Sequence, residues 1–217
     1  WFRSDLRIDD NPALLNASKT CDELIGIYFF SKSQWALHNE SAVKLEFVHK
    51  NLILLEQSLQ KLNIPLLVIE TQNYESLSSD LVSFAKLNSV DHIFWNNEFG
   101  VNEGKRDLAV THLLKDSGIN ATYFDDQVIY EPGYLRTGQG KPFSVFTPFK
   151  RRWIENFSLD FLNLEKATKP LKITQLNSDL SPLNFPKKNV VDMTLWPAGE
   201  VSALERLSSF LANKVNS

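Results

Sequence analysis

The sequence predicts an α/β fold, in which a doubly wound, parallel, five-stranded sheet of the Rossmann-like type carries helices on both faces. The first observation is an alternation of strand-like and helix-like stretches over residues 1–125, as in parallel sheets with crossover helices. The second is that some strand-like stretches are almost continuously apolar, as strands buried on both faces should be. The third is a change of composition after residue 125, which ends the predicted domain there.

Each element of this domain has its own pattern. Trp1-Phe2-Arg3 matches the end of a strand, so we expect a chain that is a piece of a longer protein. Asn11-Pro12 supplies an N-cap followed by proline at the first helical position. Leucine and valine recur at intervals of three and four from 45 to 62, which predicts one long amphipathic helix. In chain order we expect helix 12–18, strand 23–30, helix 45–62, strand 65–70, helix 75–87, strand 92–95, helix 103–116 and strand 121–125.

The composition is that of an ordinary globular domain, with 217 residues, 43% of them hydrophobic and 23% charged. The net charge of −3 argues against a chain that binds nucleic acid by itself, because phosphate binding goes with a basic surplus. The single cysteine, Cys21, excludes an internal disulfide and suits a reducing compartment, so we expect a cytoplasmic protein. No apolar run approaches a membrane span, and no secretory signal precedes the fold.

The second part of the chain has a different character. Prolines, glycines, asparagines and serines accumulate over residues 126–198, which we interpret as an interdomain linker. Helical periodicity returns in residues 199–217, which we interpret as the first helix of a second, helical domain.

Known catalytic motifs do not occur in this sequence. It has neither a phosphate loop nor a G-x-G-x-x-G turn, no cysteine and histidine spacing typical of zinc, and no recognisable Ser-His-Asp set. We therefore predict no catalytic residue and no metal site in this chain.

Two groups of charged residues admit a DNA-binding interpretation. Arg3, Asp5 and Arg7 alternate in sign, and we favour a structural set of local salt bridges. Residues 150–153, KRRW, combine basic side chains with an aromatic one, as in some single-strand binders. Because the whole chain is acidic, we favour packing of the linker for this second group.

The most informative stretch is WNNEFGVNEGKRD (95–107). Asn102 and Glu103 stand where a helix is predicted to begin, just after the end of a strand. An acid in the first turn interacts favourably with the helix dipole, so capping is one explanation. Ligands of doubly wound sheets bind beyond the carboxyl ends of the strands, so a ligand contact is the other.

Five stretches, in order, resemble the photolyase and cryptochrome family. They are WFRSDLRIDDNPAL (1–14), QWALHN (34–39), VNEGKRD (101–107), VFTPFKRRW (145–153) and WPAGEVSALERL (196–207). Together they are most similar to bacterial class I cyclobutane pyrimidine dimer photolyases. The resemblance implies an antenna domain and an interdomain linker, followed in the full-length protein by a helical domain that binds FAD and damaged DNA.

The resemblance also implies a cofactor for the site. Members that use 5,10-methenyltetrahydrofolate as antenna hold it in the cleft between the two domains. Glu103 would accept hydrogen bonds from N3–H and the 2-amino group of the pterin, and Asn102 would bind beside it. His38 lies in a stretch that resembles a second folate contact, whereas Trp35 is expected to be a packing aromatic. A deazaflavin or a second flavin also occurs as antenna on this fold.

The function implied is light harvesting for repair. The folate would pass excitation to reduced FAD, which drives the splitting of pyrimidine dimers in a monomeric protein. A cryptochrome photoreceptor without repair activity is the alternative within the family. A stand-alone nucleotide-binding module is a further alternative, which the absent phosphate loop and the long linker disfavour.

Overall fold

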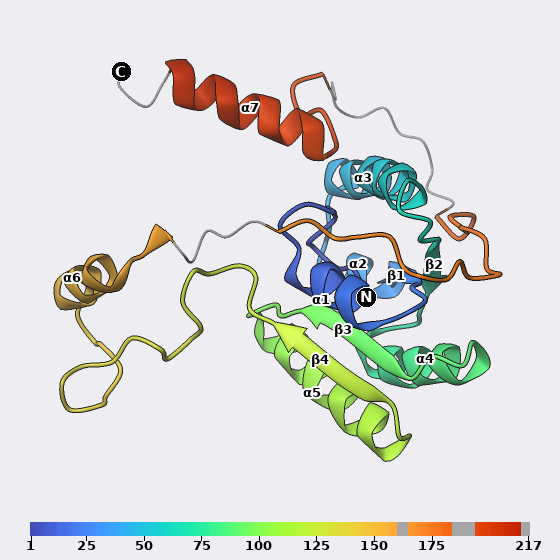
Figure 1. Cartoon of the computed structure of the whole chain (residues 1–217), viewed down its shortest axis with the longest axis horizontal. Coiled ribbons are helices and arrows are strands. Elements are labelled where there is room, and N and C mark those ends of the chain that lie inside the picture. The colour runs from blue at the N-terminus through green and yellow to red at the C-terminus, as the bar shows by residue number, and fades with distance from the viewer. Residues whose placement is uncertain (160–164, 184–193, 214–217) are drawn as a thin grey trace.

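The computed structural model describes residues 1–159, 165–183 and 194–213 (Figure 1). The strands are β1 (Gly26–Phe30), β2 (Leu66–Glu70), β3 (His92–Asn96) and β4 (Asn120–Phe124). The helices are α1 (Pro12–Thr20), α2 (Lys32–Leu37), α3 (Ala42–Gln60), α4 (Tyr74–Leu87), α5 (Val101–Asp116), α6 (Phe146–Asn156) and α7 (Glu200–Asn213). The α/β class and the parallel strands are as predicted.

The predicted five-stranded sheet is not confirmed. The described residues form two parallel pairs, β1 with β2 and β3 with β4. Trp1 and Phe2 lie between the pairs, where the Phe2 N–H donates to the carbonyl of Ile27 and the Trp1 α-amino group donates to the carbonyl of Phe94, each at 2.8 Å. Phe2 thereby makes one isolated bridge, to Tyr28, rather than a ladder.

Alternate side chains of β1 point to opposite faces of the sheet, and helices pack against both faces. Tyr28 and Phe30 belong to a core cluster with the leucines of α3, among them Leu52 and Leu59. Ile27 belongs to a second cluster, built largely from α4 and α5. Figure 1 shows α3 on one side of the strands and α4 and α5 on the other, which is the doubly wound arrangement.

The region after β4 differs from the predicted irregular linker in two ways. It contains α6, which has Pro148 in its first turn and no side-chain cap, so its sequence carries no helix-start pattern. It also returns to the α/β body, where the Val68 N–H donates to the Asp179 carbonyl and the Asp179 N–H donates to that of Leu66, both at 2.9 Å. The last predicted helix corresponds to α7, and residues 214–217 lie outside the described residues.

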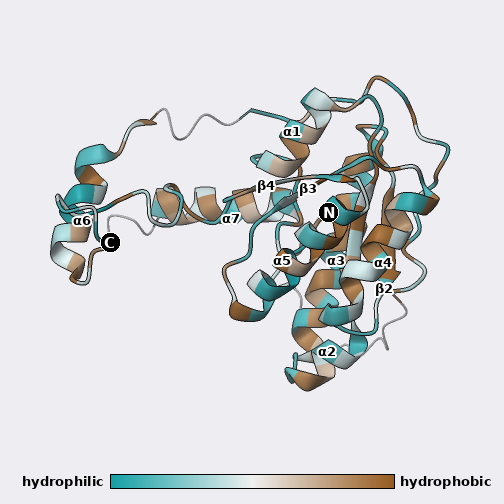
Figure 2. Ribbon diagram, turned by 90° about the horizontal axis from the view of Figure 1, so that it is seen from below, coloured by the Kyte–Doolittle hydropathy of each residue, from teal (hydrophilic) through white to brown (hydrophobic). Residues whose placement is uncertain are grey.

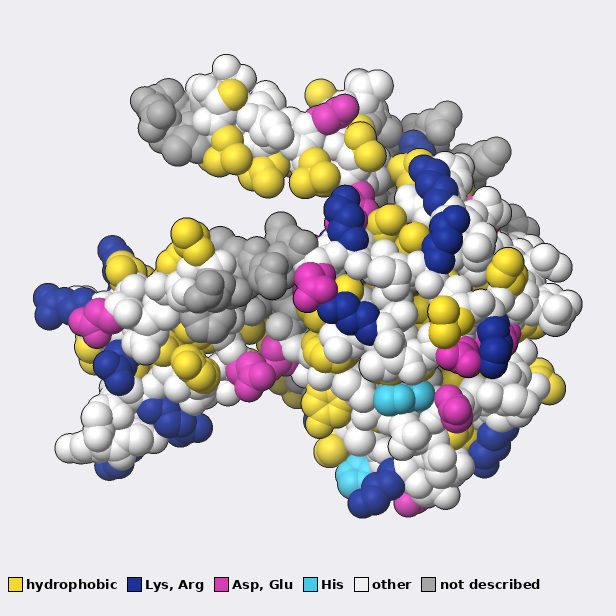
Figure 3. All heavy atoms as spheres, in the orientation of Figure 1, with side chains coloured by type: hydrophobic (Ala, Val, Ile, Leu, Met, Phe, Trp, Pro, Cys, Tyr) yellow, Lys and Arg dark blue, Asp and Glu magenta, His cyan; other side chains and the backbone are white. Residues whose placement is uncertain are grey.

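Helices α6 and α7 project from the α/β body on the same side (Figures 1 and 2). An exposed apolar stripe runs along α7, and Figure 3 shows apolar side chains on the edge of this helix that faces α6. The stripe consists of Val201, Leu204, Leu207, Phe210 and Leu211. Within the part of the chain that the structure describes, no helix is both long and apolar enough to span a membrane.

Candidate functional site

A cavity of about 810 Å³ opens at the carboxyl ends of β1 and β3. Segments that follow strands line it, with Ser31 and His38 after β1 and Glu98 and Glu103 after β3. Helix α3 and residues 197–203 complete its rim. The cavity is therefore where a doubly wound sheet binds ligands.

Two of the three predicted site residues share this cavity. His38 is the exposed C-cap residue of α2, and its Nε2 lies 2.8 Å from Gln34 Nε2. Glu103 lies in the first turn of α5 and accepts a hydrogen bond from the Tyr74 hydroxyl at 3.4 Å. Asn102 precedes it in the same turn, but its side chain is exposed and does not line the cavity.

The capping explanation for Glu103 receives partial support. The N-cap of α5 is Gly100, which offers no side-chain hydrogen bond, and Glu103 is the acidic residue in the first turn. Its carboxylate occupies the space beside Gly100 that the Cβ of any other residue would need. Glu103 therefore faces the positive end of the helix and the cavity at the same time.

A buried set of four charged side chains supports the inner wall of the cavity, and three of them, Arg3, Glu98 and Arg106, line it. The side chains of Arg3 and Arg106 are each 4% exposed. Arg3 Nη1 donates to both carboxylate oxygens of Asp107 at 2.7 Å. Arg106 donates to Asp107 at 2.9 Å and to Glu98 at 3.0 Å. Two guanidinium groups are thus matched by two carboxylates, which offsets their desolvation.

The same contacts set the protonation of this wall. Burial by itself would raise the pKa of Glu98, but the hydrogen bond from Ser4 and the charges of Arg3 and Arg106 lower it overall. Burial raises the pKa of Tyr74, which Arg106 opposes and Glu103 reinforces. Near neutral pH the wall therefore presents the charged Glu98 carboxylate beside the neutral Tyr74 phenol.

Aromatic rings form much of the remaining surface. Trp35 stacks on Phe30 with ring centroids 5.2 Å apart and packs against the core, as predicted for a packing aromatic. The Arg106 guanidinium lies 5.1 Å from the Tyr74 ring and 5.0 Å from the Trp1 ring. Flat apolar walls with a few carboxylates and hydroxyls suit a planar ligand with hydrogen-bonding edges.

The sequence and structure were compared with known proteins. A family model described as DNA photolyase matches residues 1–171. The chain belongs to the DNA photolyase family. It corresponds to the N-terminal photolyase domain of class I-like members.

Individual photolyases agree with this assignment. The deoxyribodipyrimidine photo-lyase of Escherichia coli is 32% identical over 215 residues, which cover 98% of this chain and 45% of that protein. A bacterial class III photolyase from Agrobacterium tumefaciens has a similar structure, with a TM-score of 0.80, 27% identity and coverage of 98% of this chain and 44% of that one. The chain thus spans a little less than half the length of its relatives.

The fold is also shared with a cryptochrome. A cryptochrome of Synechocystis sp. PCC6803 superposes with a TM-score of 0.73 at 22% identity, covering 97% of this chain and 45% of that one. At that identity the likeness concerns the fold alone.

Sequence reasoning missed several residues that line the cavity. Tyr74, Glu98 and Arg106 line the cavity beside Glu103. Tyr74 and Glu98 each stand shortly after a strand end, a positional signal that was available in the sequence. Arg106 lies one helical turn beyond Glu103, so the periodicity of α5 places both on one face.

The prediction of local salt bridges among Arg3, Asp5 and Arg7 is wrong. Arg3 pairs with Asp107, and Arg7 pairs with Asp126 at 2.6 Å. The Asp5 carboxylate accepts hydrogen bonds from the Arg3 backbone at 2.7 Å and from Asn96 at 2.6 Å. The set is structural, as expected, but it joins segments distant in sequence.

In the second basic group, Trp153 packs as favoured. Its ring stacks on Phe157, with centroids 5.3 Å apart, and meets Tyr130 edge-on. Residues 150–152 are exposed. Among the described residues, no group of three or more histidine, cysteine or acidic side chains is arranged to hold a metal ion.

Proposed function

We propose that this chain is the light-harvesting part of a deoxyribodipyrimidine photolyase and that it binds a folate antenna, 5,10-methenyltetrahydrofolate. The observation that carries the proposal is the Glu103 carboxylate on a cavity at the carboxyl ends of the strands. His38, which follows β1, lines the same cavity as Glu103, which follows β3. Two segments distant in sequence would thus contact one ligand.

The chemistry of Glu103 suits a pterin. A pterin presents N3–H and a 2-amino group as two parallel donors, and a carboxylate offers two acceptors at matching spacing. The Tyr74 hydroxyl, 3.4 Å from Oε1, holds the carboxylate in place, and the positive end of α5 favours its charge. Asn102, one residue earlier on an exposed edge of the same turn, would contact the part of the folate that projects from the cavity.

The remaining parts of the activity belong to the full-length protein. We propose that a helical domain, continuing after α7, holds FAD and the damaged DNA. Reduced flavin supplies one-electron chemistry for splitting cyclobutane pyrimidine dimers, and this chain contributes antenna contacts rather than catalytic residues. We propose a cytoplasmic monomer, with α7 and its exposed apolar stripe as the start of the second domain.

A flavin-type antenna is the second candidate, because the cavity extends well beyond Glu103. Its lining also includes Trp1, Tyr28 and Arg3. A three-ring chromophore would fill the aromatic inner part of the cavity, whereas a pterin would bind at its rim. Cryptochrome signalling without repair is the alternative for the full-length protein.

Substitution of Glu103 by glutamine in the full-length protein tests the folate proposal. Gln keeps the shape of the side chain but turns one acceptor into a donor that faces N3–H or the amino group. Because a hydrogen bond to a charged group contributes about 1.5–3 kcal/mol, folate affinity should fall roughly ten- to a hundredfold. Folate stoichiometry and affinity are measured by absorbance and fluorescence, alongside flavin content and a thermal melt.

A matched control is available in α4. Glu75→Gln makes the same chemical change in the first turn of a helix but outside the cavity. We expect this control to keep parental folate affinity. If Glu103→Gln also binds folate like the parent and only melts earlier, Glu103 is a helix cap and the folate site is not here. A parent protein that binds a flavin antenna at this site and does not bind folate would favour the second candidate.

A further inference from the structure

Tyr28 lines the cavity at the carboxyl ends of the strands, and the proposed function gives it no role. It stands in the middle of β1, in the core cluster beside α3, and only 9% of the residue is exposed. Its hydroxyl has no hydrogen-bond partner among the described residues, and its oxygen is not fully enclosed. A buried polar group normally has a partner, so this hydroxyl is available to a ligand.

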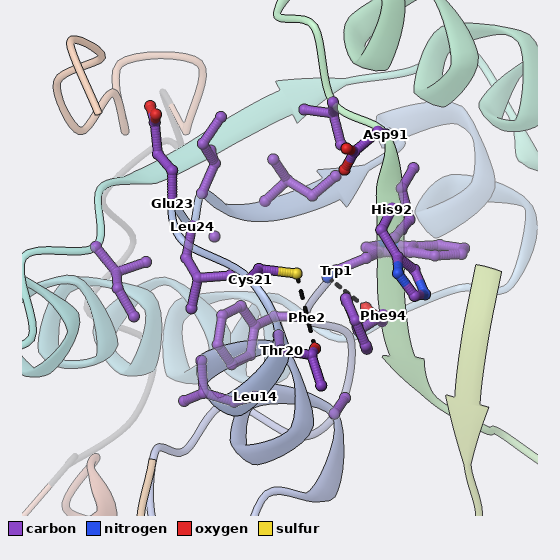
Figure 4. A pocket seen from close by; sticks show the side chains of 18 of the residues that line it. Trp1, Phe2, Leu14, Thr20, Cys21, Glu23, Leu24, Asp91, His92 and Phe94 are labelled. Carbon is purple, nitrogen blue, oxygen red and sulfur yellow. Dashed lines mark hydrogen bonds between the residues drawn. The ribbon is translucent and has the colours of Figure 1, made fainter. Parts of the chain in front are cut away.

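The hydroxyl belongs to one of two large cavities in the α/β body. The other cavity, of about 580 Å³, lies between β1 and β3 at their amino ends, where Leu14, Leu24 and Phe94 surround it (Figure 4). Tyr28 is not part of that lining. Its hydroxyl therefore opens into the cavity that Glu103 lines, at the opposite ends of the strands.

Residues from three other segments surround the Tyr28 hydroxyl. Burial is the largest cause that raises its pKa, and Glu98, Tyr74 and Glu40 raise it further. Glu98 follows β3, Tyr74 begins α4, and Glu40 lies between α2 and α3. All three line the cavity. The hydroxyl thus lies inside the cavity and keeps its proton at neutral pH.

The acceptors of the inner wall are already engaged. Glu98 accepts from Ser4 with one carboxylate oxygen and from Arg106 with the other. Asp107 accepts from Arg3 and Arg106. Two buried nitrogens of Arg3, Nε and Nη2, have no hydrogen-bond acceptor in the part of the chain that the structure describes. The wall therefore has donors to spare, and a ligand that completes it should bring an acceptor oxygen.

The rim of the cavity has the opposite character. Glu103 offers a carboxylate, and in the proposed function this carboxylate accepts from a ring N–H. Tyr74 connects the rim with the inner wall, because its hydroxyl donates to Glu103 at 3.4 Å and it is one of the groups that act on Tyr28. A cyclic amide carries its N–H and its carbonyl on adjacent ring atoms. A ring whose N–H meets Glu103 therefore presents a carbonyl oxygen beside that bond.

We propose that the Tyr28 hydroxyl donates a hydrogen bond to this ring carbonyl, so that Glu103 and Tyr28 together recognise a cyclic amide edge. The inference rests on the proposed function and deepens it, because it names the part of the ring that the cavity selects. Pterins and flavins both carry such an edge. A ring with an amino group in place of the carbonyl brings a donor to a wall that already has donors to spare.

Tyr28→Phe in the full-length protein tests this role, because it removes the hydroxyl and keeps the ring. Folic acid has the ring carbonyl at position 4, and aminopterin differs from it only by an amino group there. In calorimetric titrations we expect Tyr28→Phe to bind folic acid about two- to tenfold more weakly than the parent, and aminopterin equally well. Riboflavin supplies the flavin form of the same edge, so the probe whose affinity falls identifies the type of ring.

Two comparisons separate binding from folding. Tyr123→Phe makes the same chemical change on β4, at a residue that is 52% exposed and lies outside the cavity, and it should bind every probe like the parent. Because the Tyr28 hydroxyl has no partner within the described fold, Tyr28→Phe should melt at the parental temperature or above.

The inference is overturned if the parent binds folic acid or riboflavin and Tyr28→Phe binds it equally well. It is also overturned if the variant loses affinity for aminopterin as much as for folic acid, or melts several degrees earlier, since the hydroxyl would then serve the fold. Glu103→Gln distinguishes this failure from that of the proposed function. A parent that binds neither ring contradicts both, whereas weaker binding in Glu103→Gln alone contradicts only the role of Tyr28.

Discussion

Glu98 shows how single side chains maintain the inner wall of the cavity at the carboxyl ends of the strands. It accepts hydrogen bonds from Ser4 and from Arg106, and its Oε2 lies 3.9 Å from Arg3 Nε. Without this carboxylate, two buried guanidinium groups would share the single charge of Asp107. Leaving a buried charge without its partner costs about 3–5 kcal/mol in other proteins, so Glu98 is a structural requirement of the site.

A pH prediction follows from the lowered pKa of Glu98. A carboxylate whose pKa is lower in the folded state stabilises the fold above its unfolded pKa, and this stabilisation is lost as pH falls through the folded value. The free energy of unfolding should therefore drop more steeply below about pH 4.5 in the parent than in Glu98→Gln. Urea unfolding between about pH 7 and 3 measures this.

An exposed acid provides the control for that comparison. Glu155 has a side chain that is 64% exposed and lies 3.9 Å from Arg152, so Glu155→Gln should reproduce the parental curve. If the free energy of unfolding depends on pH in the same way in the parent and in Glu98→Gln, the charge of Glu98 does not stabilise the fold.

The residues of the site were only partly predictable from sequence. His38 and Glu103 follow from short stretches that resemble the family, and both line the cavity. The pairing of Arg3 with Asp107 joins residues 104 positions apart, and local charge alternation carries no information about such a contact. The sequence therefore identified the rim of the cavity and missed its inner wall.

At the scale of elements, hydrogen bonds at the start of α7 hold this helix on the α/β body. The Glu200 carboxylate accepts from the backbone N–H groups of Ile8 and Asp9, at 3.1 and 2.9 Å. Next to it, the Gly199 N–H donates to Asn51 Oδ1 at 2.9 Å, with a φ of +94° that favours glycine. These bonds place the start of α7 on the rim of the cavity that Glu103 lines.

Removal of this carboxylate should release α7. In Glu200→Ala both acceptors are lost, and each charge-assisted bond contributes about 1.5–3 kcal/mol, so the amides of Ile8 and Asp9 should exchange roughly ten- to a hundredfold faster. Hydrogen exchange resolved at single amides is the measurement. Glu205→Ala changes an exposed acid on the same helix and should leave both amides unaffected. Unchanged exchange in Glu200→Ala would show that other contacts hold α7.

The elements themselves were largely predictable because strong periodicity marks them. The long helix expected over 45–62 is α3 (Ala42–Gln60), and strand 92–95 is β3 (His92–Asn96). The six-residue α2 was missed, because a helix of fewer than two turns leaves little periodicity. The eleven-residue α6 was missed because it lies among prolines and glycines and has no side-chain N-cap to mark its start. The five-stranded sheet was predicted from the alternation of elements, but Phe2 contributes only one bridge here.

At the scale of the whole molecule, the chain is less than half of the relatives that it matches. The cavity lies on the α/β body, from which α6 and α7 project. The chain as a whole has a net charge of −3, and the basic residues 150–152 of α6 are exposed. In the proposed function, this part gathers light for a larger protein.

The action spectrum of dimer repair tests this account most directly. It is measured with the full-length protein, folate and FAD, in the parent and in Glu103→Gln, by counting dimers removed per photon at each wavelength. We predict two bands in the parent, one from the folate and one from the flavin. The folate band should be selectively lost in Glu103→Gln at limiting folate. Identical spectra in the two proteins, or no removal of dimers by the parent at any wavelength, would contradict the account.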